Sequence, residues 1–73
     1  MVRYKVDYLT DTQERILAVI RRRIAEDGVA PTVAELAAEL GRSVSAVHYQ
    51  LGELEAKWAI VRQPGTPRGI RLT

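Results

Sequence analysis

The sequence contains no cysteine and only one histidine, His48. Without thiols it can form neither a disulfide framework nor a thiolate metal site, and a lone histidine does not complete a zinc site. No apolar run approaches the roughly 20 residues of a membrane-spanning helix, and the N-terminus lacks the charged and apolar regions of a signal peptide. We therefore expect a cytoplasmic protein with no cofactor, no metal and no membrane partner.

Catalytic side chains are equally scarce. One histidine, no cysteine and no carboxylates on a common face leave little for acid–base or nucleophilic chemistry. A chain of 73 residues forms one domain with one core, which leaves little room for a pocket of substrate size. We expect neither an enzyme nor a small-molecule substrate.

Acidic residues are absent from position 56 to position 73, where the chain carries Lys57, Arg62, Arg68 and Arg71. The formal net charge is only +2, so this local concentration indicates a nucleic-acid partner better than the total charge does. A solvated basic tail is the alternative interpretation.

Residues 1–8 alternate in hydropathy, with Val2, Tyr4, Val6 and Tyr8 on one parity. This period of two predicts either a strand that pairs with another segment or a frayed extension. We place a domain boundary here and expect residues 9–73 to form the folded domain.

Capping signals predict three helices. Thr10 with Gln13 and Thr32 with Glu35 are capping boxes, and Ser43 is a typical N-cap residue. The helices are expected over residues 9–27, over 33–40 with a stop at position 41, and from 44 to about 57. Apolar residues at helical spacing form the expected core stripes, which are Ile16, Leu17, Ile20, Ile24, Val33, Leu36, Ala37, Leu40, Val44, Val47, Leu51 and Leu54.

A period of two returns in residues 60–63 and 69–72, which predict two strands. Pro64 and Gly65 predict the turn between them, because proline presets one central position and glycine supplies the positive φ of the next. Trp58 is expected in the core or at its rim, between the third helix and this hairpin. The fold class is therefore α+β, with three helices and a C-terminal two-stranded wing.

Two short helices joined by a turn containing Gly41 are typical of a helix-turn-helix, in which a small residue such as Ala37 lets the helices cross closely. The second helix of this motif enters the major groove of DNA, and cations beside it meet phosphates. A solvated histidine is the alternative for His48, and a contact with the wing is the alternative for Tyr49. The candidate DNA-binding residues are Thr32, Arg42, Ser43, Ser45, Ala46, His48, Tyr49, Gly52, Arg62, Arg68 and Arg71.

These motifs together resemble the N-terminal DNA-binding domain of the LexA repressors, the regulators of the bacterial DNA-damage response. The likeness extends over residues 9–72, and each piece of it is weak alone. It is carried by Leu9-Thr10 with Gln13, Pro31-Thr32 with Glu35, Ser43 with Val47-His48 and Leu51, Leu54-Glu55 with Lys57, and Pro67-Arg68 with Ile70.

The resemblance implies a winged helix-turn-helix whose third helix reads bases in double-stranded DNA, and an association with the nucleoid when bound. The chain departs from the family in four ways. The turn after Gly41 is one residue shorter than in some members, and the alternating residues 2–8 are not part of the usual pattern. The chain ends at Thr73, before the self-cleaving domain of that family would begin, so we expect it neither to cleave itself nor to dimerise through that domain. Trp58 stands where the family usually has glycine, so the end of the third helix is expected to differ.

Two functions of different class follow from this fold. The first is a sequence-specific transcriptional regulator; the second is a winged-helix module for protein–protein interaction or assembly. A homodimer could form through the strand over residues 1–8, whose edge can add to another sheet, or on the DNA itself. A single copy contacts few phosphates, so we expect weak binding unless the chain pairs.

Overall fold

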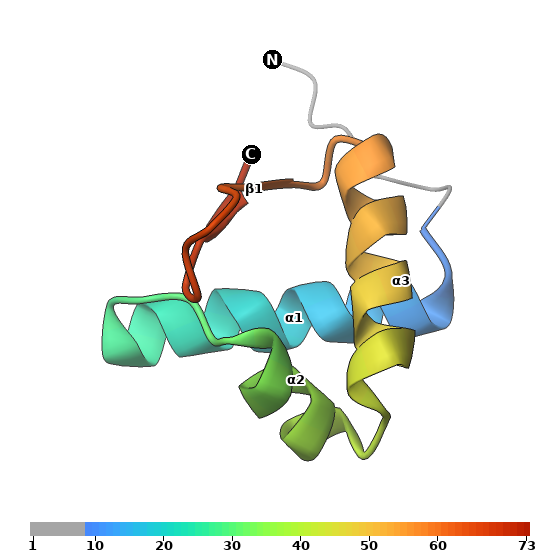
Figure 1. Ribbon diagram of the computed structural model, residues 1–73, viewed down its shortest axis with the longest axis horizontal. Helices are drawn as coiled ribbons and strands as arrows, with labels where there is room; N and C mark the ends of the chain where they lie inside the picture. The colour runs from blue at the N-terminus through green and yellow to red at the C-terminus, as the bar shows by residue number, and fades with distance from the viewer. Residues whose placement is uncertain (1–8) are drawn as a thin grey trace.

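The computed structural model describes residues 9–73, which form three helices and a two-stranded antiparallel sheet (Figure 1). The elements follow in the order α1 (Asp11–Asp27), α2 (Val33–Leu40), α3 (Val44–Ala56), β1 (Ile60–Arg62) and β2 (Ile70–Leu72). The predicted α+β winged-helix fold is confirmed. The strand predicted within residues 1–8 lies outside the described residues.

Each helix begins after its predicted capping residue. The Thr10 hydroxyl accepts the Gln13 backbone N–H at 3.1 Å, and the Gln13 side-chain oxygen accepts the Thr10 N–H at 3.1 Å. Thr32 and Glu35 make the same reciprocal pair at 3.1 and 3.0 Å, and Ser43 caps α3 through its hydroxyl. These bonds satisfy backbone donors that the first turn of a helix leaves without partners.

The Gln13 side chain also joins α1 to α3. Its nitrogen donates to Gln50 Oε1 at 2.9 Å, and its oxygen accepts from Lys57 Nζ at 2.8 Å. Gln13 is the one polar side chain in the buried set of residues 9–73. Because its oxygen also accepts the Thr10 N–H, its burial leaves no polar atom without a partner.

The end of α3 differs from the ends of α1 and α2. Gly28 and Gly41 end the first two helices in the left-handed conformation, as predicted, whereas Trp58 takes this conformation after α3 with φ +63°. The Trp58 N–H donates to Glu55 O at 3.1 Å, and the Ala59 N–H donates to Leu54 O at 2.9 Å. These two bonds form a Schellman motif, which usually places glycine at this position.

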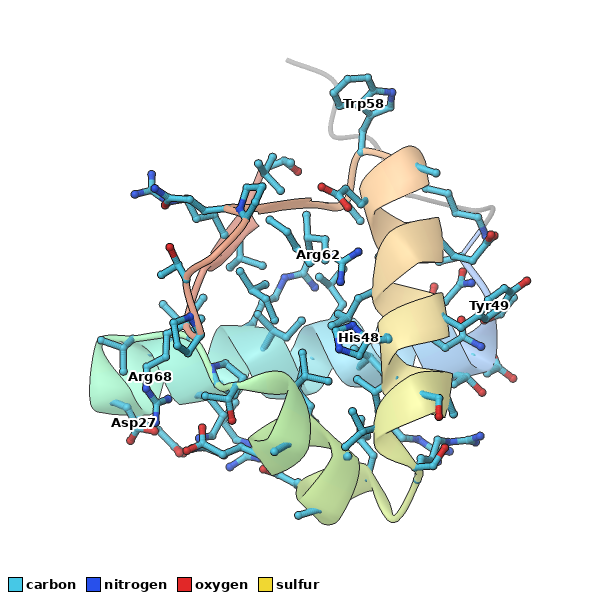
Figure 2. The ribbon with its side chains drawn as sticks, in the orientation of Figure 1. Asp27, His48, Tyr49, Trp58, Arg62 and Arg68 are labelled. Atoms are coloured by element: carbon cyan, nitrogen blue, oxygen red, sulfur yellow. The ribbon has the colours of Figure 1, made fainter. Side chains whose placement is uncertain are left out.

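The expectation that Trp58 lies in the core or at its rim is wrong. Its side chain is 78% exposed and projects away from the domain (Figure 2). The left-handed residue turns the chain back toward the helices, so the next two residues, Ala59 and Ile60, occupy the buried positions instead.

The core lies where the three helices and the hairpin meet. The expected stripe of α3 begins later than predicted, because Val44 is 47% exposed. Val44 lies in the first turn of α3, beside the exposed residues 41–43 rather than over the core. The buried apolar set is Ile16, Leu17, Ile20, Ala30, Leu36, Ala37, Val47, Leu51, Leu54, Ala59, Ile60 and Ile70, with Leu9, Val19, Ile24, Val33 and Leu40 partly buried against it.

The hairpin packs across the helices as a wing. In Figure 1 it lies on the opposite side of α1 from α2, and β1 contacts α3. Val61 pairs with Arg71 in the middle of the register. Gly65 has the predicted positive φ, +76°, and Gly69 closes the turn by donating to Thr66 O at 3.1 Å.

Candidate nucleic-acid interface

The outer face of α3 carries the predicted polar stripe. Ser45, His48 and Tyr49 are exposed and Gly52 is half-buried. Since successive helical residues lie about 100° apart, His48 and Tyr49 flank this face, with His48 on the side of the wing and Tyr49 on the far side (Figure 2). The alternative that Tyr49 packs against the wing is therefore wrong, and its side chain is 66% exposed.

The first turn of α3 presents both hydroxyl and backbone groups. The Ser43 oxygen accepts the Ala46 N–H at 3.1 Å, so the hydroxyl proton stays available to donate. Arg42 and Ser43 are exposed, and Ala46 is half-buried. A helix N-terminus attracts anions through its dipole, and here an exposed arginine lies just before it.

A groove of about 330 Å³ separates α3 from the wing. His48 and Glu55 line it from α3, Val33 lines it from α2, and residues 62–67 line it from the hairpin. Elements distant in sequence thus form one concave surface beside the polar stripe.

Arg62 reaches across this groove from β1 to α3 (Figure 2). Its Nε donates to Glu55 Oε1 at 3.2 Å, and a Cβ atom at Gly52 would lie 4.0 Å from its Nη2. That distance is an ordinary van der Waals contact, so the guanidinium lies directly next to this face of the helix. The bond to Glu55 occupies one of five N–H donors, so the others remain chemically able to bind a phosphate.

Arg68 and Arg71 do not join this surface. Arg68 forms a forked ion pair with Glu35 on α2, at 2.9 and 2.8 Å. Arg71 is exposed and lines a second groove beside Gly28, at the end of α1. The remaining candidate, Thr32, caps α2 beside Glu35, and its hydroxyl oxygen serves that cap.

The Glu35 carboxylate is the centre of an ionic cluster. The forked bonds from Arg68, followed by the bond from the Thr32 backbone, lower the pKa of Glu35 from 4.5 to about 2. Arg23 of α1 also donates to Glu35, at 3.3 Å, and to Glu39, at 3.4 Å, and Arg22 pairs with the same Glu39. The pairing with Glu35 raises the pKa of Arg68, so both partners stay charged near neutral pH.

The sequence reading missed the two carboxylates that pair with the wing. A segment without acids suggested a row of free cations, but Glu55 and Glu35 from the preceding helices pair with Arg62 and Arg68. Such pairing depends on how the hairpin packs, because its separations of 7 and 33 residues join a helix to the hairpin and follow no single period. The one available signal is Glu35 itself, whose place in the capping box accounts for only part of its bonding.

Two features are absent from residues 9–73: a cluster of metal ligands and a membrane-spanning helix. Within residues 9–73, acidic side chains and His48 form no group of three that could hold a metal ion. No helix in the same range has the length and apolar character to cross a bilayer.

The chain is similar to proteins of one family. Residues 6–69 match the family model described as the LexA DNA binding domain. The chain is 52% identical over 65 residues to LexA repressor 2 of Xanthomonas campestris pv. campestris, and 54% identical over 65 residues to the LexA repressor of Herminiimonas arsenicoxydans. Each alignment covers 88% of this chain and 30% of the relative.

A third relative extends the aligned length slightly. The LexA repressor of Halorhodospira halophila is 49% identical over 69 residues, which cover 93% of this chain and 30% of that protein. The chain therefore spans about 30% of the length of these relatives. The resemblance read from the motifs is confirmed.

Proposed function

Because this chain belongs to the LexA DNA-binding domain family, we propose that it binds double-stranded DNA with sequence preference and serves as the DNA-reading part of a transcriptional repressor. The observation that carries this proposal is the outer face of α3. Ser45, His48 and Tyr49 expose hydroxyl, imidazole and phenol groups on one helix, and such groups hydrogen-bond to base edges in a major groove.

In this proposal α3 enters the major groove and the wing lies on the adjacent backbone. The exposed first turn, with Arg42 and Ser43, is suited to base edges and a neighbouring phosphate. Arg62 stands beside the same helix face and is the wing cation best situated for a phosphate. Phosphate contacts fix the register on the duplex, and the α3 side chains supply the preference.

The test is a titration against random-sequence duplex DNA at two salt concentrations, followed by selection of the bound sequences. A salt-dependent affinity with an enriched motif is the expected result. Ser45→Ala combined with Tyr49→Phe should relax the motif and leave the salt slope unchanged. Arg62→Ala should weaken binding to all sequences and reduce the slope of log affinity against log salt by about 0.9, the value for one phosphate.

Arg21→Ala is the matched charge control, because Arg21 is an exposed arginine on α1. It should change neither the motif nor the slope. An unchanged motif after the double substitution in α3 would show that another face reads the bases.

A protein-interaction module is the second candidate, and the exposed Trp58 favours it. An indole that is 78% exposed on a backbone with positive φ is an unusual surface feature. This function would be preferred if the chain bound no duplex DNA even at low salt. Light scattering on the full 73-residue chain would then test self-association, including pairing through residues 1–8.

A further inference from the structure

Arg68 makes more hydrogen bonds to the rest of the domain than any other wing side chain in the described residues 9–73. Its two terminal nitrogens donate to the two Glu35 oxygens at 2.9 and 2.8 Å, and Nη1 also donates to Ala30 O at 2.9 Å. This forked geometry requires the planar guanidinium, since the ammonium of lysine presents only a point charge.

The partners of Arg68 lie at the start of the helix-turn-helix. Glu35 is on the first turn of α2, where it also accepts the Thr32 N–H at 3.0 Å and a bond from Arg23 of α1 at 3.3 Å. One carboxylate therefore connects α1, α2 and the wing (Figure 2 shows Arg68 near Asp27, at the end of α1).

Two ion pairs tie the wing to the two helices of the helix-turn-helix. Arg62 connects β1 to Glu55 on α3. Arg68, which lies in the turn before β2, connects the hairpin to Glu35 on α2. The wing strands are only three residues each, and each places one residue in the core, Ile60 and Ile70. The two ion pairs add polar contacts that hold the hairpin against α3 and α2.

We infer that Arg68 is a positioning residue, whose pair with Glu35 sets the wing against α3, rather than a direct phosphate contact. This inference rests on the proposed function, because the wing angle matters for binding only if the wing meets DNA. It replaces the direct role that the sequence suggested for Arg68.

Glu35→Gln gives a sharp test, because it removes the charge and keeps the cap. Gln13 already occupies the corresponding position of α1 and accepts the Thr10 N–H through its amide oxygen, so glutamine is compatible with this helix start. If Arg68 acts through Glu35, Glu35→Gln and Arg68→Gln should each weaken DNA binding about two- to fivefold, the upper part of the range for an exposed ion pair. The double variant should be no weaker than either single one.

The opposite pattern would identify a phosphate contact. In that case Glu35→Gln would leave affinity unchanged or increase it, because the guanidinium would be released, and Arg68→Lys would retain most of the affinity. The positioning role predicts that Arg68→Lys binds as weakly as Arg68→Gln. Circular dichroism must show that every variant is folded at the assay temperature, so that a loss of stability alone does not lower the measured affinity.

A DNA-free measurement separates this inference from the proposed function. Backbone amide NMR shifts of Gln63, Thr66 and Gly69 should move together in both single variants, because these residues make the hydrogen bonds of the wing turn. Unchanged wing shifts would overturn the positioning role whether or not the chain binds DNA. Shifted wing amides in a chain that binds no duplex would contradict the proposed function alone.

Discussion

Replacing Trp58 by glycine should stabilise the domain, although it removes the only tryptophan. Trp58 has φ +63° at the end of α3, where its Cβ approaches the following carbonyl oxygen. This conformation destabilises a residue other than glycine by about 1–2 kcal/mol. Burial of the indole offsets little of this destabilisation, since the side chain is 78% exposed.

The net effect is smaller than the strain itself. Glycine loses about 0.5–1 kcal/mol more backbone entropy on folding than alanine. The midpoints of the two ranges differ by about 0.75 kcal/mol, and Trp58→Gly is predicted to raise the free energy of unfolding by that amount. For a domain of this size such a change raises Tm by roughly 3–6 °C.

Trp58→Ala is the matched control, because alanine removes the indole and keeps the Cβ. Its stability should lie within about 0.5 kcal/mol of the parent chain. Thermal and urea unfolding should be followed by circular dichroism, since both variants lack the fluorophore. A Trp58→Gly variant no more stable than Trp58→Ala would refute the left-handed conformation at this position.

Three further predictions concern stability. Gly69→Ala should destabilise the wing, because a Cβ there would lie 2.6 Å from the Gln63 carbonyl oxygen; the readout is a loss of wing amide dispersion in NMR spectra, with the shifts of α1 retained. Because the pKa of Glu35 falls from 4.5 to about 2 on folding, its ionised form stabilises the domain above about pH 4.5, and this contribution disappears as the pH falls toward 2. Urea midpoints measured across that window should fall less steeply in Glu35→Gln, and an equal slope would contradict the role of the carboxylate. Ala37→Leu should cost about 1–3 kcal/mol by overfilling the contact between α2 and α3, whereas the exposed neighbour Ala38→Leu should be nearly neutral.

The local features of the fold could be predicted from the sequence because short-range chemistry determines them. Thr10 and Thr32 reach backbone groups within one helical turn, and Gly65 supplies the positive φ of a tight turn. The partners in each of these interactions are at most a few residues apart, so a short stretch of sequence is enough to predict the interaction.

The features that sequence reasoning missed depend on packing between distant elements. The pairs formed by Arg62 and Arg68 arise only when the hairpin folds against the helices. A large apolar residue between α3 and the hairpin is expected in the core or at its rim, but the position of Trp58 in the Schellman motif directs its side chain to solvent. The sequence predicts the exposed stripe of α3. It does not predict that Arg62, rather than Arg68, lies beside that stripe.

The Gln13 amide has a consequence for the cooperativity of the domain. The first turn of a helix normally frays, opening with a free energy far below that of global unfolding. Here the same side chain that caps α1 also holds Gln50 and Lys57 of the α3 region. Opening the start of α1 therefore breaks contacts of the proposed recognition helix, and native-state hydrogen exchange should find the two segments exchanging as one unit.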